Sequence, residues 1–422
     1  MHPRDAWPLA LALALSALAG CSDPSPPPPV VNDAGDPDVA KLDSGVTGAP
    51  PVDAGPPRIA GRRCAAPTAW ATPIADYIAV GERVAPRGRF LRGVQDLAVF
   101  DGRLFFGYGD ANINLGRETP IELRAFADEG APSATAEFRT DEEQVEQYRA
   151  LDGDLWVAGV DATEDAWLGN VYRRAGGAWA KLRTVQNGVH VHDVAWWRGA
   201  LWAVGSGGTP EEWSAGDIYG HLWRSADRGA SFTVAARHHN MGAGDARWVR
   251  ILPLSDAMLL FGYRSDASGR SAIVNVRFDG TSTAPLEMTD PLRASFIVET
   301  LPLPGGGGFA RGAVNGGSGL IHRGYRVDAG GRATAIDALA GRAILDAALT
   351  EAGEVLVLSA DADEWGSERP VWSLRLDVTA DLTAFTEVAR WEESDAVRAV
   401  AYWRGAVYLG RDDGAVLRCV LE

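Results

Sequence analysis

The residues best suited to chemistry lie on one short apolar stretch, VHVHDVAWW, from Val189 to Trp197. His190 and His192 are two residues apart, so on an extended strand both side chains point to the same side, and Asp193 follows directly. Imidazole and carboxylate groups from neighbouring strands could ligate a transition metal or perform acid–base catalysis. The alternative is a water-filled channel whose polar groups satisfy one another's hydrogen bonds.

A second set of candidate ligands occupies the loop GYGDANINLGRETP. Asp110, Asn112 and Asn114 resemble the calcium-loop pattern D-x-[DN]-x-[DN]-G, with one extra residue before the glycine. The alternative is a turn that is held by its own hydrogen bonds. Asp161 stands as far past its own turn glycine as Asp110 does, and an Asp that recurs at a turn is also the usual cap of an Asx turn. The sequence therefore allows a divalent metal, either calcium or a transition metal, beside these simpler interpretations.

The stretch that carries the histidines predicts four short antiparallel strands. Gly and Asp residues separate runs of apolar, aromatic and β-branched residues, which is typical of strands and tight turns. The expected strands are His190–Trp197, Ala200–Gly205, His221–Arg224 and Ser231–Ala236. A single sheet of this kind has two exposed edges and two apolar faces, so it needs neighbours in order to be stable.

Copies of the first two strands recur along the chain. Their turn residues, about fifty residues apart, are Gly102, Gly153, Gly199, Asp256, Gly305, Gly353 and Gly405. Eight residues before each turn stands an apolar residue, as expected for the register of an inner strand: Val94, Val145, Val191, Trp248, Ile297, Leu345 and Val397. This period, with four strands per repeat, predicts an all-β fold: a seven-bladed β-propeller of four-stranded antiparallel blades.

Alignment of the inner strands places polar residues at one common position, which predicts a polar ring around a central channel. The ring residues are Asp96, Gln147, Asp193, Arg250 and Glu299. Together with the loop residues, the candidates for ligand binding are Asp96, Asp110, Asn112, Asn114, Asp161, Asp193 and Arg250, and the candidates for metal binding are His190 and His192. Thr140–Arg149 has a second interpretation, as a short helix with a capping box from Thr140 to Glu143.

One segment of the third repeat resembles the Asp box, S-x-D-x-G-x-x-[W/F]. The matching residues are Ser225, Asp227, Gly229 and Phe232. The resemblance is to propellers of the BNR type, a group that includes sialidases, and it extends loosely over Asp76 to Glu422. In that group the Asp caps a hairpin turn and the aromatic residue packs beneath it, so the motif implies a fold and not an activity. We find no pair of residues suited to the nucleophilic step of a sialidase.

The N-terminus predicts a secretory signal followed by a tether. An apolar run of about a dozen residues, too short to span a membrane, ends at Leu18-Ala19-Gly20-Cys21. This tetrad resembles the lipobox of bacterial lipoproteins, which implies cleavage before Cys21, acylation of Cys21 and, with Ser22 next, an outer-membrane destination. The alternative is an ordinary buried cysteine. The expected organisation is a signal peptide over residues 1–20, a lipidated and disordered tether over 21–63, rich in Pro, Asp and Gly, and the propeller over 64–422.

The last repeat is one strand short, so a strand from the N-terminal side should close the ring. Asp76–Leu91 has a suitable length for this strand. Cys64 precedes it and Cys419 lies in the last strand of the last repeat, so an oxidising compartment would allow a disulfide between them. Two free thiols are the alternative.

Composition and charge limit the function. Arg and Lys number 40 against 56 Asp and Glu, a net charge of −16, which argues against binding to nucleic acid. We expect a monomeric protein that is held at the cell envelope by its lipid anchor. Its propeller would bind an envelope protein or a glycan as a scaffold, and enzymatic activity is not favoured. The alternative function is a carbohydrate-active or metal-dependent hydrolase or lyase with its site on the loop face over the first three blades.

Overall fold

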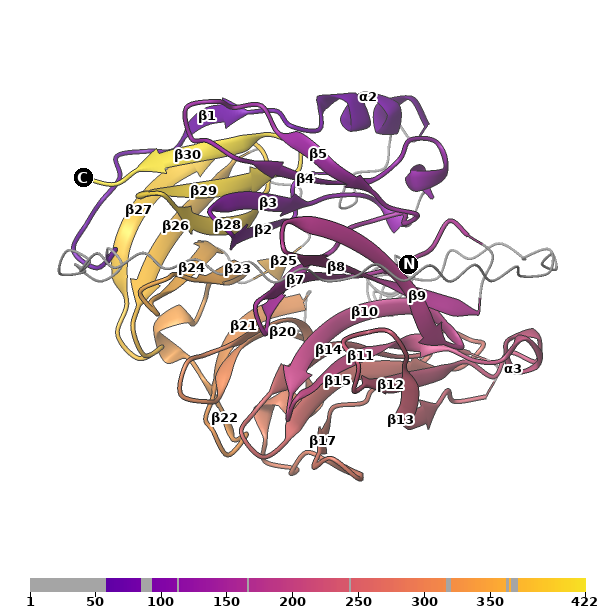
Figure 1. The fold of residues 1–422 in the computed structure, drawn as a ribbon. Coiled ribbons are helices and arrows are strands. Elements are labelled where there is room, and N and C mark those ends of the chain that lie inside the picture. Colours follow the sequence, from indigo (N-terminus) through magenta and orange to yellow (C-terminus); the bar gives the residue numbers. More distant parts are fainter. Residues whose placement is uncertain are drawn as a thin grey trace, which may run out of the picture.

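The computed structural model describes residues 58–84, 93–111, 114–164, 167–242, 244–315, 320–361, 364–365 and 371–422. Their strands form seven antiparallel sheets, each with a path of four consecutive neighbouring strands. The sheets are the blades of a propeller, with strands from both ends of the chain side by side (Figure 1). The predicted fold class is confirmed.

In each of the first four blades the strand order from the inner to the outer edge follows the chain. Blade 1 contains β2 (Asp96–Phe100), β3 (Arg103–Gly107), β4 (Glu122–Phe126) and β5 (Thr135–Arg139). Blade 2 contains β6 (Tyr148–Leu151), β7 (Asp154–Ala158), β8 (Leu168–Ala175) and β9 (Ala178–Gln186). Blade 3 contains β10 (Gly188–Trp197), β11 (Ala200–Gly207), β12 (Tyr219–Ser225) and β13 (Thr233–His239). Blade 4 contains β14 (Ala246–Pro253), β15 (Met258–Ser265), β17 (Val276–Phe278) and β18 (Thr283–Pro285), with β16 (Ser271–Ile273) also paired to β15.

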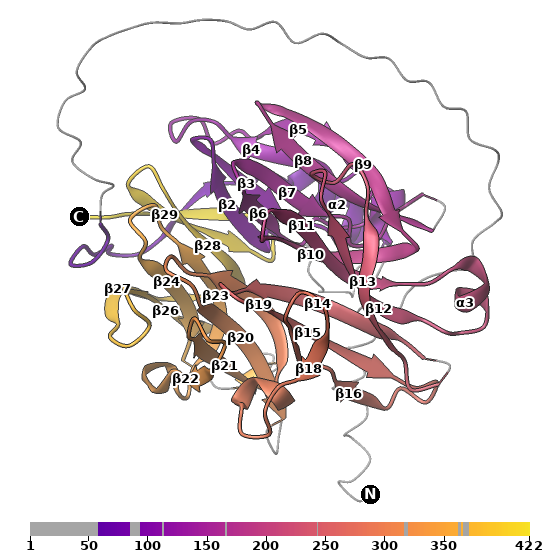
Figure 2. The ribbon, with the colours of Figure 1, turned by 60° about the horizontal axis from the view of Figure 1, so that its bottom comes forward.

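The last three blades complete the circle (Figure 2). Blade 5 contains β19 (Phe296–Pro302), β20 (Gly308–Asn315), β21 (Leu320–Val327) and β22 (Ala333–Ala335), with β25 (Glu364–Trp365) paired to β21. Blade 6 contains β23 (Ala343–Leu349), β24 (Val355–Ala360), β26 (Trp372–Thr379) and β27 (Thr386–Glu393). Blade 7 contains β28 (Val397–Trp403), β29 (Ala406–Arg411), β30 (Val416–Val420) and β1 (Thr68–Ala71). The helices are α2 (Ala75–Val84) and α3 (Pro210–Ser214), with 3-10 turns η2 (Leu115–Arg117), η3 (Pro291–Ala294) and η4 (Asp337–Leu339).

Tight turns join the first two strands of four blades. Both central residues of these turns have positive φ, as a type I′ turn requires, and the second is a glycine: Asp101-Gly102, Asp152-Gly153, Arg198-Gly199 and Arg404-Gly405. This turn matches the twist of the strands on either side, which explains why the glycine recurs in the sequence. We call the end of the propeller with these turns the turn face, and the opposite end the loop face.

The blades pack on one another through apolar side chains. The seven apolar residues that set the predicted register are all buried, from 0% exposed at Val191 to 4% exposed at Leu345. Separate apolar clusters lie between neighbouring blades; one, for example, joins Trp156 of blade 2 to Val194 and Trp223 of blade 3. Burial of these faces supplies the stability that an isolated blade would lack.

The ring is closed by an N-terminal strand, but not by the segment that the sequence suggested. The outer strand of blade 7 is β1, in which Thr68 pairs with Arg418 and Ala69 with Leu417. The prediction for Asp76–Leu91 was wrong, because Ala75–Val84 forms helix α2; residues 85–92 lie outside the described part of the chain. The apolar residues Ile74, Tyr77 and Ile78 recur at a helical spacing, and both isoleucines contact the turn at Gly414 of blade 7.

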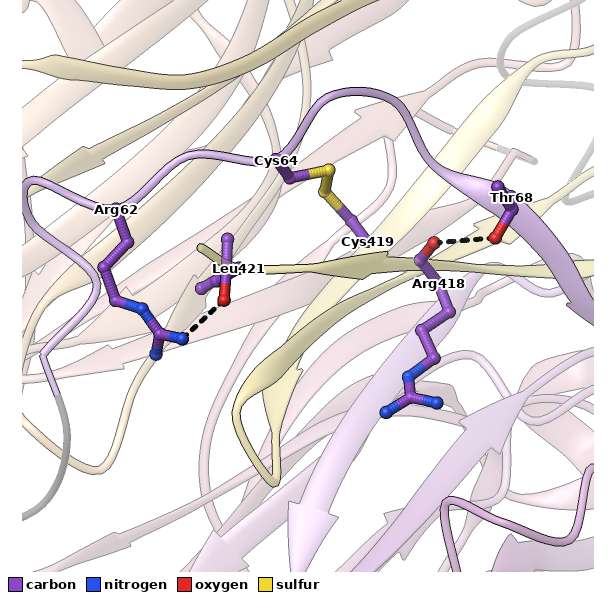
Figure 3. Close-up of a disulfide and its surroundings, with 6 residues drawn as sticks. All are labelled: Arg62, Cys64, Thr68, Arg418, Cys419 and Leu421. Atoms are coloured by element: carbon purple, nitrogen blue, oxygen red, sulfur yellow. Dashed lines mark hydrogen bonds between the residues drawn. A yellow bond between two sulfur atoms is a disulfide. The ribbon is translucent and has the colours of Figure 1, made fainter.

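A strap before β1 holds this closure together (Figure 3). Cys64 and Cys419 form the expected disulfide, with 5.9 Å between their Cα atoms. Arg63 and Glu422 exchange two backbone hydrogen bonds of 3.2 and 2.8 Å. Ile59 is fully buried, and its N–H donates to the Glu354 carboxylate of blade 6 at 2.7 Å. The strap, residues 59–64, therefore joins blades 6 and 7. None of the helices in the described ranges is long and apolar enough to cross a membrane.

Candidate functional site

The predicted polar ring lies on the inner strands, with one correction to its register. A β-bulge follows the apolar register residue in blades 3, 4, 5 and 7, and the same bulge in blade 6 follows Ile344. The assignment of Leu345 to this register position was therefore one residue off. The first turn of blade 6 is longer than the type I′ turns, since Leu349 pairs with Val355. Counting eight residues back from its glycine therefore misplaced the register position. The sequence reasoning thus missed Asp346. The complete inner ring is Asp96, Gln147, Asp193, Arg250, Glu299, Asp346 and Ala399.

The four carboxylates of the inner ring each fasten their own blade to the next one. Each accepts a hydrogen bond from a backbone N–H on the inner strand of the following blade. The bonds are Tyr148 to Asp96 at 2.8 Å, Ile251 to Asp193 at 3.0 Å, Ala347 to Glu299 at 3.0 Å and Val400 to Asp346 at 2.6 Å. A carboxyl oxygen can accept a backbone hydrogen bond in either protonation state, so these contacts hold neighbouring inner strands in register.

One arginine spans the channel between distant blades. The Arg149 guanidinium of blade 2 donates to both oxygens of Asp193 in blade 3, at 2.9 and 2.8 Å. It also donates to the carbonyl and hydroxyl oxygens of Thr300 in blade 5, at 2.8 and 3.0 Å. Asp193 is 1% exposed, and its carboxylate is directed to Arg149 and to the Ile251 N–H and not to the histidines beside it. The geometry gives Asp193 a structural role.

Two other arginines in the channel also form ion pairs. Arg250 donates to Glu146 of blade 2 and to the Val298 carbonyl of blade 5, both at 2.7 Å. Arg311 donates to Glu299 at 2.7 Å. The positive charges of these groups are therefore compensated within the channel wall. In the inner ring, this leaves Asp96 and Asp346 as the carboxylates whose described hydrogen bonds come from backbone groups alone.

A cavity of about 820 Å3 runs along the channel, and all seven blades contribute to its lining. Near the middle of the inner strands its wall is polar and contains Asp96, Arg250, Glu299 and Asp346. Toward the turn face the wall is largely apolar, although Asp152, Thr350 and Glu351 also line it; the apolar and aromatic residues there are Val99, Leu151, Trp196, Pro302, Leu349 and Tyr402. Volumes of this size are typical of small-molecule sites, which are mainly apolar with a few well-placed polar groups.

The two candidate metal ligands lie on β10 of blade 3, near Asp161 of blade 2 and Arg247 of blade 4, and outside the cavity lining. His190 and His192 are each 2% exposed and their rings are stacked, with 6.0 Å between centroids. His190 Nδ1 is 3.0 Å from Ser206 Oγ, and its Nε2 is 3.8 Å from an Asp161 oxygen. Burial, with Arg247 nearby, holds the pKa of both histidines well below the usual range, so both rings are neutral at pH 7. Across the described ranges, no three His, Cys, Asp or Glu side chains are placed to hold a metal ion.

The acidic candidates on the loops join blades 1 and 2 in a buried network. Asp110 is fully buried, Asn114 has a left-handed backbone before η2 without a capping hydrogen bond, and Asn112 lies outside the described residues. Asp161 contributes its backbone N–H to Glu142, and its own pKa is raised to about 6 by burial. The structure thus brings the loops of Asp110 and Asp161 together, and the central residue between them is one that the sequence did not single out.

That residue is Glu142, which is 1% exposed. Its carboxylate accepts from Asn170 at 2.7 Å, from the Tyr172 hydroxyl at 2.9 Å and from the Asp161 backbone at 3.2 Å. Burial raises the pKa of Glu142 to about 8. The alternative interpretation of residues 140–149 as a helix was wrong, because this segment is extended and bridges both blades. The run of acidic residues before β6 was the only signal, and it resembles an exposed loop.

The Asp-box segment forms the turn between β12 and β13. The Ser225 hydroxyl donates to Asp227 at 2.7 Å, and Asp227 also accepts from the backbone and hydroxyl of Ser231 at 2.9 and 2.6 Å. These bonds lower the pKa of Asp227 to about 2. Gly229 has a φ of 89° and packs on Leu182 and Trp156 of blade 2, and Phe232 is 1% exposed. The segment therefore stabilises a hairpin against the preceding blade.

No family model and no curated protein matches the chain. Solved structures that match include virginiamycin B lyase from Staphylococcus aureus, with 11% identity, a TM-score of 0.45, and coverage of 80% of this chain and 97% of that chain. Another is BamB from Moraxella catarrhalis, with 11% identity, a TM-score of 0.34, and coverage of 77% and 94%. A third is an α-L-arabinofuranosidase from Fusarium graminearum, with 9% identity, a TM-score of 0.35, and coverage of 65% and 91%. At these identities and scores none of the three supports a conclusion about activity.

Proposed function

We propose that this protein is a lipoprotein of the cell envelope whose propeller is a binding module, with the central channel as its ligand site. The observation that carries the proposal is the cavity of about 820 Å3, which every blade helps to line. Three channel arginines are engaged in ion pairs that hold the blades, so the wall is a rigid and preorganised surface. Envelope proteins or glycans, the partners expected from the sequence, would meet the protein at the rim of this channel.

The anchor is proposed from the N-terminal residues. The lipobox-like tetrad that ends at Cys21 and the Pro-rich segment after it support acylation and an outer-membrane destination. The strap supports this arrangement, because it fixes residues 59–64 to the outside of blades 6 and 7 and keeps the ring closed without a membrane contact. The Asp-box geometry around Asp227 supports a relation to propellers of the BNR type.

The binding proposal is tested by ligand-observed NMR of the purified full chain with a library of small molecules and glycan fragments. We expect hits that lose their signal when Ala348 is replaced by Phe, because Ala348 lines the cavity and is half-buried, so the larger ring would fill the channel. Hits that bind the A348F variant equally well would place binding elsewhere on the surface. The absence of any hit would contradict the proposed function.

The anchor leads to a separate prediction. Replacement of Cys21 by Ser removes the sulfur that would carry the lipid, so the variant should move from the membrane fraction to the soluble periplasmic or extracellular fraction. Fractionation followed by immunoblotting measures this change, and Ser22→Ala is the matched control, expected to remain with the membrane. A Cys21→Ser variant that fractionates like the parent would show that the association does not depend on acylation.

A further inference from the structure

The inner ring carries two carboxylates that lack a cationic partner. Asp193 pairs with Arg149, and Glu299 with Arg311. In contrast, only the Oδ2 atom of Asp96 and the Oδ2 atom of Asp346 accept described hydrogen bonds, and both donors are backbone N–H groups. Both residues line the cavity. These two carboxyl groups therefore face the cavity without an ion-pair partner among the described residues.

Blade 7 lies between these two carboxylates, and its inner strand has small side chains at the level of the ring. Its ring position is Ala399, and Ala401, further along the same strand, lines the cavity. Tyr402 follows on the lining; it is 8% exposed, and its hydroxyl has no hydrogen-bond partner among the residues that the structure describes. This hydroxyl is closed off from the cavity, and the ring belongs to the apolar cluster shared by blades 6 and 7, so Tyr402 contributes apolar surface and no polar contact to a ligand.

The cavity continues from these groups toward the turn face with a largely apolar wall, and Asp152, Thr350 and Glu351 also line it there. Val99, Ala348, Leu349 and Pro302 contribute to this part of the lining. A ligand that fits both halves needs a positively charged donor at one end and an apolar body at the other. A bound metal ion does not meet this description, since the described residues include no group of three metal-ligating side chains.

We propose that the channel binds a small organic amine, with its ammonium group between Asp96 and Asp346 and its apolar body along the turn-face half of the cavity. This proposal rests on the proposed function and specifies its ligand class. An ammonium group has three donors, so it can donate to a carboxylate oxygen of each of the two residues. The apolar body gains free energy by leaving water for the aliphatic wall.

The electrostatics of the ring favour such a cation. Burial raises the pKa of Asp96 to about 7, with Glu299 raising it further and Arg149 and Arg250 opposing the rise. Burial, Glu299 and Asp96 raise the pKa of Asp346 well above its usual range, and Arg311 opposes this. A raised pKa means that a proton competes for the carboxylate at neutral pH. Because an aliphatic amine stays charged up to about pH 10, its binding should become tighter as the pH rises from 6 to 8.

The test is isothermal titration of the full chain with hexylamine, and with hexanol and hexanoate as probes of the same length. At pH 8, hexylamine should bind at least about tenfold more tightly than either of the others, the scale of one charge-assisted hydrogen bond. Asp346→Asn should lower the affinity by about the same factor while it keeps an acceptor for the Val400 N–H. A change from pH 8 to pH 6 should weaken binding by up to about tenfold.

Glu392→Gln is the matched control, since Glu392 is an exposed residue on the outer strand of the same blade as Asp346. Its removal changes the net charge equally and should leave the affinity unchanged. Equal binding of the three probes, or equal loss in the control, would overturn the amine proposal and leave a ligand-binding channel. The amine proposal is also overturned if hexylamine does not bind while other compounds of the library bind in the channel. If no compound of any class binds, the proposed function itself fails.

Discussion

Replacement of Cys64 by Ser should lower the melting temperature of the protein by several degrees. The bond between Cys64 and Cys419 spans 355 residues of sequence and links the two ends of the ring. A chain-entropy model gives roughly 5 kcal/mol for loops of this length, which is an upper figure. Loss of the bond also loosens the strap, which would then be held to blade 7 by its backbone hydrogen bonds with Glu422 and by the Arg62 guanidinium, which donates to the Leu421 carbonyl at 2.6 Å. Opening at this point would expose two strand edges. Differential scanning calorimetry measures the change.

Three comparisons identify the disulfide as the cause. Cys419→Ser and the double variant should melt at the temperature of Cys64→Ser, because each removes the same bond. Reductant should lower the melting temperature of the parent to that of the variants and leave the variants unaffected. Peptide mapping without reductant should recover Cys64 and Cys419 as one linked pair. Protein purified without reductant in which both thiols are free would contradict the prediction.

The sequence predicts the architecture because local physics repeats in every blade. The type I′ turns require glycine at positions such as Gly199, and the packing between blades requires an apolar residue such as Val191. Both requirements act within a few residues, so they remain visible in the sequence. The blade 6 register failed because its longer first turn changes the distance from Gly353 to the inner strand. The closing strand β1, TAWA, is too short to be recognised by its alternation, and the longer α2 was mistaken for it.

The candidate site is less visible, because its contacts join distant parts of the chain. The position of Asp193 on the ring follows from the alignment, but its partner Arg149 lies 44 residues earlier and reaches Thr300, 151 residues later. No local pattern indicates that Arg149 extends across the channel. The same applies to Glu142, whose acidic neighbours suggest a solvated loop although its carboxylate is buried between two blades. Composition can show that charges are present, but only the fold shows which of them are compensated.

The cross-channel arginine leads to the second large expected effect. Arg149→Met should lower the free energy of unfolding by about 3–5 kcal/mol, the usual cost of leaving one charge of a buried pair without its partner. Asp193 is 1% exposed and would lose both bonds from the guanidinium, and Thr300 would lose two more. Methionine keeps most of the aliphatic length, so the change reports on the charge and its hydrogen bonds. Guanidinium-induced unfolding, followed by tryptophan fluorescence, measures the shift in midpoint.

A double-mutant cycle with Asp193→Asn separates the pair from its surroundings. The double variant should lose clearly less stability than the two single losses combined, because residues in one ion-pair network couple. Arg270→Met is the matched control: Arg270 pairs with Asp266 on the surface and its side chain is 74% exposed, so the loss should be at most about 1 kcal/mol. If Arg149→Met unfolds at the same midpoint as the parent, Asp193 is not held by this pair. Its carboxylate would then again be a candidate for binding a ligand or a metal beside His192, as the sequence first suggested.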